Sequence, residues 1–311
     1  MNTAAELIVT PNPAASYAEA CGRFAAQLER DTPAIDPLSR ARLTTPDRRA
    51  ERVIVFFHGL TNAPRQFEKL SERFIARGYA VLVPRVPYHG YRDRMTTDLA
   101  NLTVRDLVEV TAEAVDLAAG LADEVTVSGI SMGGIQAIWA AQYRPVALAA
   151  PIAPALGLPK IPYATTGAIF GAMGRFPNRF MWWDPRVKDK LPGPPYAYPR
   201  FATHALVATQ RLGLRLMEVA RTERPAAQRI WMISNAADLA VSNSAAATLV
   251  RRWIASGAAS VQAYRFPRQL KLFHDVVDPL QPNAQPELVH PMLEQIIVDG
   301  QPPEMPKLQT G

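Results

Sequence analysis

From about residue 51 onward the sequence alternates between strand-like and helix-like segments, and this alternation constrains the fold more than any other feature. Residues 52–57 form a nearly continuous apolar run, which is typical of a strand covered on both faces. A helical pattern of apolar residues follows at 64–77, and a second apolar strand follows at 79–83. Strands that alternate with helices predict an α/β fold, in which a mostly parallel sheet has helices on both faces. Further strands are predicted at 124–128, 147–152, 229–233 and 261–266, and further helices at 98–119, 132–143, 204–221, 243–256 and 286–298.

The alternation stops between residues 155 and 203, where proline, glycine and aromatic residues are frequent. A segment of this length is too long for an ordinary connection, and such segments are usually lids or binding loops. The first 50 residues contain one predicted helix, at about 15–29. We therefore expect an N-terminal helical extension at 1–50, a core at 51–154 and 204–300, an inserted cap or lid at 155–203, and a frayed tail at 301–311.

A glycine-bracketed serine, Gly129-Ile130-Ser131-Met132-Gly133, lies between the predicted strand at 124–128 and the next helix. In this context the pattern G-x-S-x-G predicts a nucleophile elbow, a tight turn that holds the serine at the carboxyl edge of a sheet. Backbone segments approach one another closely in such a turn, so Gly129 and Gly133 are expected where a Cβ atom would clash. Ser131 is therefore the predicted catalytic nucleophile.

A serine hydroxyl is a weak nucleophile, so it needs a base within hydrogen-bond reach and an acid that orients the base. In elbow folds the acid and then the histidine follow the serine along the chain. His274 follows the last predicted strand, which places it at the same edge of the sheet as Ser131, and it is the favoured base. His204, at the start of a helix, and His290, within the terminal helix, remain alternatives.

Asp238 is the favoured acid, because it follows the predicted strand at 229–233. An aspartate at this place could instead cap the following helix. Asp275 and Asp278 are rivals, although Asp275 is the immediate neighbour of His274, which makes poor geometry for a bond to the imidazole Nδ1.

An oxyanion hole requires two backbone N–H donors. One is expected from Met132, the residue after the nucleophile, and the other from Leu60, in the loop after the first core strand. His58, in that loop, and His89, in the loop after the next strand, are expected to fix their loops rather than transfer protons.

The net charge of +6 and the pI of about 9.6 come from scattered basic residues, which indicates a solvated basic surface rather than a nucleic-acid-binding protein. Cys21 is the only cysteine, so no intramolecular disulfide can form. The histidines lack the spacing of metal ligands, and we expect neither a metal nor a cofactor. Without a signal peptide or a run of about 20 apolar residues, the sequence predicts a cytoplasmic protein with no stable membrane insertion.

These motifs together resemble the α/β-hydrolase superfamily, most closely its bacterial serine carboxylesterases and monoacylglycerol-lipase-like or serine-aminopeptidase-like hydrolases. The matching pieces follow in order: His58-Gly59-Leu60-Thr61, then Arg77-Gly78-Tyr79 leading to Pro84-Arg85-Val86-Pro87-Tyr88-His89-Gly90, then Gly129-Ile130-Ser131-Met132-Gly133-Gly134, and last Asp238 with His274. The resemblance implies the roles given above for Ser131, Asp238, His274, Leu60 and Met132, and it implies a cap at 155–203. The usual initial β-hairpin is not evident, which leaves the number of strands open.

The resemblance implies a serine hydrolase that cleaves carboxylic esters through an acyl-enzyme on Ser131. Its expected partner is a small-molecule ester with an apolar acyl group, and Trp182 and Trp183 either line the substrate pocket or pack within the lid. Acyl transfer and the cleavage of thioesters, amides or lysophospholipids use the same triad, so they remain alternatives. A non-catalytic protein that binds a ligand on the same scaffold is a further alternative, and the oligomeric state stays open.

Overall fold

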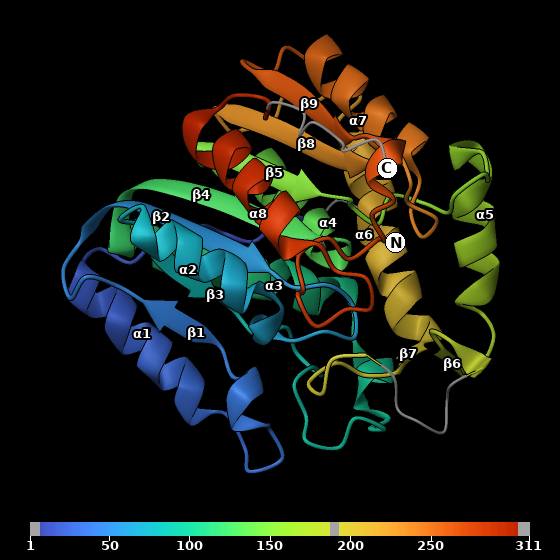
Figure 1. Ribbon diagram of the computed structural model, residues 1–311, viewed down its shortest axis with the longest axis horizontal. Coiled ribbons are helices and arrows are strands. Elements are labelled where there is room, and N and C mark those ends of the chain that lie inside the picture. The colour runs from blue at the N-terminus through green and yellow to red at the C-terminus, as the bar shows by residue number, and fades with distance from the viewer. Residues whose placement is uncertain (1–6, 187–192, 304–311) are drawn as a thin grey trace, which may run out of the picture.

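A seven-stranded sheet forms the centre of the computed structural model, which describes residues 7–186 and 193–303 (Figure 1). The strand order is β1-β3-β2-β4-β5-β8-β9. Strand β1 is antiparallel to β3, and all other neighbouring strands are parallel. The mostly parallel sheet predicted from the alternation is therefore confirmed. The strands span Arg42–Thr44 (β1), Ala50–Phe57 (β2), Ala80–Val83 (β3), Ala122–Ile130 (β4), Leu148–Ile152 (β5), Arg229–Asn235 (β8) and Val261–Phe266 (β9).

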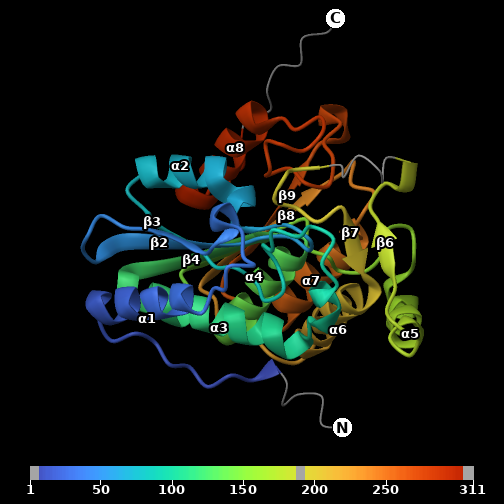
Figure 2. The same ribbon diagram turned by 90° about the horizontal axis from the view of Figure 1, so that it is seen from below.

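Helices cover both faces of the sheet, as predicted. Helices α2 and α8 lie on one face, and α1, α3 and α4 lie on the other (Figure 2). The helices span Tyr17–Glu29 (α1), Glu68–Ala76 (α2), Val104–Leu121 (α3), Met132–Tyr143 (α4), Tyr163–Met173 (α5), Thr203–Val219 (α6), Asn243–Ala255 (α7) and Pro286–Glu294 (α8). Among the described residues, none of these helices combines the length and the apolar character needed to cross a membrane.

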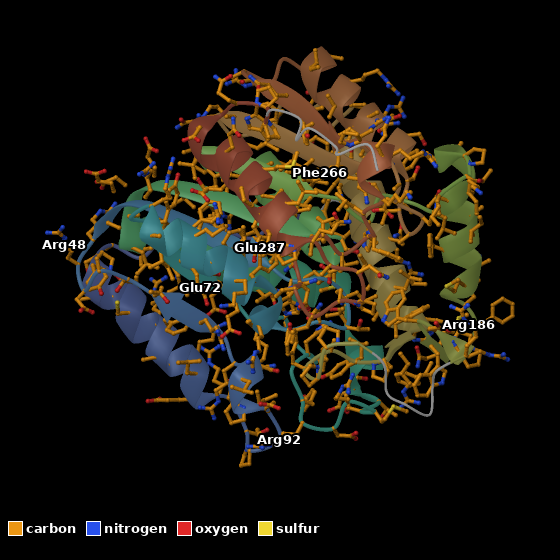
Figure 3. All side chains as sticks on the ribbon, in the orientation of Figure 1. Arg48, Glu72, Arg92, Arg186, Phe266 and Glu287 are labelled. Carbon is orange, nitrogen blue, oxygen red and sulfur yellow. The ribbon has the colours of Figure 1, made fainter. Side chains whose placement is uncertain are left out.

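The core explains why the strands are apolar along their whole length. Residues 53–57 of β2 are all fully buried, because helices pack against both sides of this central strand. The ring of Phe56 stacks on Phe67 at 4.7 Å and meets the edge of Phe74 at 5.3 Å, which joins β2 to helix α2. Burial of each such side chain contributes roughly 1.5–3 kcal/mol. Phe266 at the end of β9 is also fully buried, whereas Arg48, Arg92 and Arg186 lie exposed in separate regions of the surface (Figure 3).

The structure differs from the sequence predictions in three places. The first 50 residues contribute not only helix α1 but also strand β1, which pairs with β3 at the edge of the sheet. The helix predicted from residue 98 begins at Val104, because the Thr103 side chain and Asp106 form a capping box that starts it there. The terminal helix ends at Glu294 and continues as a π-helical turn at Gln295–Asp299. Most of the predicted frayed tail lies outside the described residues.

The irregular segment at 155–203 contains helix α5 and a small antiparallel sheet of strands β6 (Phe180–Trp182) and β7 (Arg200–Ala202). Helix α5 packs against α6, which follows the segment directly in the chain. The segment therefore lies beside the core rather than within its sheet (Figure 1).

Candidate active site

Ser131 lies at a strained turn between strand β4 and helix α4. Its φ of 59° and ψ of −113° are unusual for a residue with a side chain. The turn is held by backbone hydrogen bonds, since the Ser131 N–H donates to Ile152 O at 3.1 Å and the Ser131 carbonyl accepts from Ala155 N–H at 3.0 Å. Ser131 is partly exposed, whereas the next residue, Met132, is fully buried. The turn thus leaves the serine accessible at the carboxyl edge of the sheet.

The two glycines around Ser131 have the steric role predicted from the sequence. A Cβ atom on Gly133 would lie 1.9 Å from the carbonyl oxygen of Phe57 and 2.8 Å from that of His58. A Cβ atom on Gly129 would lie 2.8 Å from the same Phe57 oxygen. All these neighbours are backbone atoms, so no side-chain rotation could relieve the clash. An alanine at either position would therefore force the backbone to shift.

The structure brings His274 and Asp238 together, although 36 residues separate them in the chain. The Nδ1 atom of His274 lies 2.7 Å from Oδ2 of Asp238. The Asp238 side chain is fully buried, and its Oδ1 also accepts from the N–H groups of Ala240 and Val241. The N-cap of the following helix α7 is Ser242, so Asp238 does not cap that helix; its Oδ1 closes a local turn and its Oδ2 contacts the histidine.

The pKa of His274 is raised above its ordinary value of 6.5. Burial by itself would lower the pKa, but the hydrogen bond that His274 donates to Asp238 and the charges of Asp238 and Asp275 outweigh it. The other ring nitrogen, Nε2, is buried and has no hydrogen-bond partner among the described residues, Ser131 included. Hydrogen bonds between catalytic groups are often long before substrate binds. The His274 ring thus has one nitrogen held by a carboxylate and one available.

Asn235, at the end of β8, contributes a contact that the sequence analysis missed. Its side-chain amide donates to the carbonyl oxygens of Leu272 and Phe273, at 3.0 and 2.9 Å. These carbonyls belong to residues 271–278, which we call the histidine loop. Asn235 therefore ties the histidine loop to the strand that leads to Asp238. Its position at the end of a predicted strand was the one signal that could have suggested this.

Residues 58–62, which we call the oxyanion loop, differ in whether their backbone N–H groups are hydrogen-bonded. The N–H of Gly59 donates to the Gln66 side chain at 2.8 Å, and the N–H of Thr61 donates to His89 Nε2 at 3.2 Å. Between them, the N–H of Leu60 has no acceptor in the described part of the chain. Met132 is the first residue of helix α4, where the backbone N–H has no partner within the helix. The two N–H groups predicted for an oxyanion hole are thus both available.

His58 and His89 hold the oxyanion loop against the loop after β3. His58 Nε2 accepts from Val86 N–H at 3.1 Å, and His89 Nε2 accepts from Thr61 N–H. Both rings are fully buried, and burial lowers the pKa of His58 well below 6.5 and that of His89 to about 4. Both are therefore neutral near pH 7 and act as fixed hydrogen-bond partners of the two loops.

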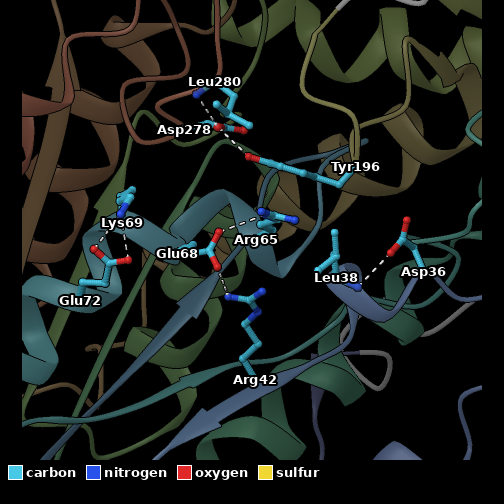
Figure 4. A network of polar contacts seen from close by, with 10 residues as sticks. All are labelled: Asp36, Leu38, Arg42, Arg65, Glu68, Lys69, Glu72, Tyr196, Asp278 and Leu280. Atoms are coloured by element: carbon cyan, nitrogen blue, oxygen red, sulfur yellow. Dashed lines mark hydrogen bonds and ion pairs between the residues drawn. The ribbon is translucent and has the colours of Figure 1, made fainter.

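The alternative site residues make other contacts. Nε2 of His204 pairs with the carbonyl of Phe176, and Nε2 of His290 pairs with that of Val277. Asp275 Oδ1 accepts from the backbone N–H groups of Val277 and Asp278, so it does not orient the imidazole. Asp278 accepts a hydrogen bond from the hydroxyl of Tyr196 at 2.7 Å (Figure 4).

Trp183 contacts the oxyanion loop, and Trp182 pairs with Arg200 in the small β6–β7 sheet. The indole N–H of Trp183 donates to Thr61 Oγ1 at 2.8 Å, and its ring packs on Phe201 at 4.4 Å. Half of Trp183 remains exposed, and Trp182 lies in strand β6. No cluster of three or more metal-binding side chains occurs within residues 7–186 and 193–303.

Comparison with known proteins places this geometry in a family. The model of the alpha/beta hydrolase family matches residues 54–286. The chain belongs to this family. A similar fold is found in a solved structure from the study of LipS and LipT, two metagenome-derived lipolytic enzymes. The two chains are 20% identical, with a TM-score of 0.60, and the match covers 85% of this chain and 98% of that one. The monoacylglycerol lipase of Paleococcus ferrophilus matches at 16% identity and a TM-score of 0.61, over 84% of this chain and 98% of that one.

One curated relative of this chain is a thermostable monoacylglycerol lipase from Bacillus sp. (strain H-257). The two are 29% identical over 115 residues, which make up 37% of this chain and 45% of the relative. The chain thus spans less than half of the length of this curated relative. The relatives and structural neighbours are lipases and esterases, so the resemblance predicted from the motifs is confirmed at the level of the family and the fold.

Proposed function

We propose that this α/β-hydrolase is a serine hydrolase that cleaves carboxylic esters. The observation that carries the proposal is the His274–Asp238 pair, with its free Nε2, at the sheet edge that also holds the strained Ser131. An accessible serine, a buried carboxylate and an imidazole, in that order along the chain, are the parts that acyl transfer to a serine needs. The lipases and esterases among the relatives support an ester as the substrate.

The proposed reaction begins when His274 Nε2 takes the proton of Ser131 Oγ and the oxygen attacks the ester carbonyl. The N–H groups of Leu60 and Met132 bind the negative oxygen of the tetrahedral intermediate, and each such donor is worth about 3 kcal/mol in the transition state. His274 then gives its proton to the leaving alkoxide. Water activated by the same nitrogen cleaves the acyl-enzyme and frees Ser131. Throughout, the buried Asp238 carboxylate stabilises the imidazolium and holds the ring through Nδ1.

We propose further that the segment at 155–203 is a cap that borders the acyl site. Two hydrogen bonds to Thr61 of the oxyanion loop support this. The Trp183 indole N–H donates to Thr61 Oγ1, and the backbone N–H of Tyr198 donates to the Thr61 carbonyl at 2.7 Å. Phe176 and Met181 of the same segment are exposed by 68% and 50%, which gives it an apolar surface. The substrate proposed from this surface is an ester with an apolar acyl chain, such as a monoacylglycerol.

The test is hydrolysis of p-nitrophenyl esters from acetyl to palmitoyl, and of a monoacylglycerol, by the wild type and three variants. Ser131→Ala and His274→Ala are expected to lose at least about 10³-fold in kcat/KM. His204→Ala is the matched control, because this histidine pairs only with a carbonyl, and it should stay near wild-type activity. A folded wild type that hydrolyses none of these esters and does not react with a fluorophosphonate would refute the proposal.

Two finer statements need their own measurements. Product analysis with competing alcohols separates hydrolysis from acyl transfer, because an acyltransferase would form the new ester in preference to the free acid. The cytoplasmic location inferred from the sequence stays a prediction, which fractionation of cells that express the protein would check.

A further inference from the structure

Gln66 bridges two loops of the candidate site that are more than 200 residues apart in the chain. It lies in the short 3₁₀ helix Pro64–Phe67 after the oxyanion loop, and it is only 3% exposed. Its Oε1 accepts from the N–H of Gly59 at 2.8 Å, and its Nε2 donates to Oδ2 of Asp275 at 2.8 Å. The orientation of the amide follows from its partners, since an N–H requires an acceptor and a carboxylate requires a donor.

Asp275 in turn shapes the histidine loop directly after His274. Its Oδ1 accepts from the N–H groups of Val277 and Asp278, both at 3.1 Å. Its Oδ2, besides the bond from Gln66, accepts from the Gln281 side chain at 3.1 Å and, more weakly, from the Asn62 side chain at 3.5 Å. The Nδ1 atom of His274 is bonded to Asp238, so Asp275 takes no part in that pair. The Asp275 carboxylate therefore acts on the conformation of the loop.

We propose that Gln66 is a positioning residue, which fixes the Leu60 oxyanion donor relative to His274 through its bonds to Gly59 and Asp275. The inference rests on the proposed function, because it concerns the geometry of that reaction. The transition state must contact His274 and the Leu60 N–H at the same time. The two groups come from distant parts of the chain, and a displacement of about 1 Å between such groups can reduce the rate by about 100-fold.

The test is a double-variant cycle that reverses the polarity of the bridge. Gln66→Glu keeps an acceptor for Gly59 but sets a second carboxylate against Asp275. We expect a loss of about 10-fold to 100-fold in kcat with a small change in KM, because the oxyanion forms only in the transition state. In Gln66→Glu with Asp275→Asn, the asparagine amide can donate to the new carboxylate and its oxygen can still accept from Val277 and Asp278. This double variant should recover part of the lost kcat, because the asparagine amide no longer accepts from Gln281.

Gln142→Glu is the matched control. Gln142 is also a buried glutamine that links separate segments, since its amide donates to the carbonyls of Glu223 and Arg224 and accepts from the Trp253 indole. It lies at the far end of helix α4 from Ser131, so the variant should lose stability but keep the kcat of the folded enzyme. Urea unfolding of each variant shows which losses come from unfolding alone.

The outcomes separate the two proposals. Gln66→Glu with wild-type kcat, or a folded double variant whose loss equals the product of the two single losses, would overturn the positioning role while ester hydrolysis stands. A wild type that neither hydrolyses esters nor reacts with a fluorophosphonate would overturn both.

Discussion

Gly133→Ala tests whether the turn around Ser131 depends on the absence of one methyl group. The new Cβ would lie 1.9 Å from the Phe57 carbonyl oxygen, whereas ordinary contacts begin at about 3.4 Å. Phe57 is the last residue of β2 and pairs with Gly129 of β4, so its carbonyl cannot move without disturbing the sheet. Overpacking of this kind typically costs about 1–3 kcal/mol, and the rigid backbone on both sides places this variant at or above the upper end.

The same clash should also reduce activity. The clash pushes β2, which leads to the oxyanion loop, away from α4, which begins after Ser131. Because nucleophile and oxyanion donors would separate, we expect kcat/KM to fall by at least about 100-fold. Hydrolysis of a p-nitrophenyl ester measures the activity, and urea unfolding measures the free energy of unfolding.

Gly22→Ala is the control for the glycine substitution itself. Gly22 lies inside helix α1, and nothing lies within 4 Å of the Cβ that alanine would add. This variant should gain about 0.5–1 kcal/mol of stability, because alanine favours a helix over glycine. A Gly133→Ala protein with wild-type stability and activity would refute the steric argument, and so would an equal loss of stability in Gly22→Ala.

Three further predictions follow from the polar contacts. Asp238→Asn should lower kcat by about 10⁴-fold with little change in stability, and it should lower the pKa of His274 in the pH–rate profile. A fall in kcat of less than about 10-fold would contradict the role of Asp238 as the acid that orients His274. Burial lowers the pKa of His89 from 6.5 to about 4. As the pH falls from 6.5 to about 4, the unfolded state therefore binds a proton at His89 before the folded state does. The free energy of unfolding should fall by up to about 3 kcal/mol over this range. Urea unfolding at pH 7 and pH 4.5 should show a smaller difference for His89→Gln than for the wild type, and an equal difference would exclude this cause. Burial and the charge of Asp275 raise the pKa of Asp278 to about 6. Tyr196→Phe removes the hydrogen bond to this carboxylate, so it should raise the pKa further and lower the free energy of unfolding by about 1–3 kcal/mol at pH 7.5. A urea unfolding curve equal to that of the wild type would show that this buried bond does not stabilise the fold.

Much of the fold and of the nucleophile's surroundings could be predicted from the sequence, because these features depend on residues close together in the chain. An apolar strand that ends in G-x-S-x-G carries its own steric requirement, and the clashes found at Gly129 and Gly133 agree with it. The alternation of strands and helices likewise follows from local periodicity. Strand β1 was missed because its three residues, Arg42–Thr44, are too few to show a period, and it forms only by pairing with β3.

The sequence by itself determined the α/β architecture, the turn at Ser131 and a short set of candidate acids and bases. Only the tertiary structure decided how the candidates pair. Asp275 is adjacent to His274 in the chain, but its carboxylate turns to the N–H groups of its own loop, so the imidazole meets Asp238 from another strand end. Gln66 belongs to no motif, and its bridge exists because the sheet brings the ends of distant strands to one edge. Side-chain pairing depends on distances that chain folding sets, and local sequence patterns do not contain them.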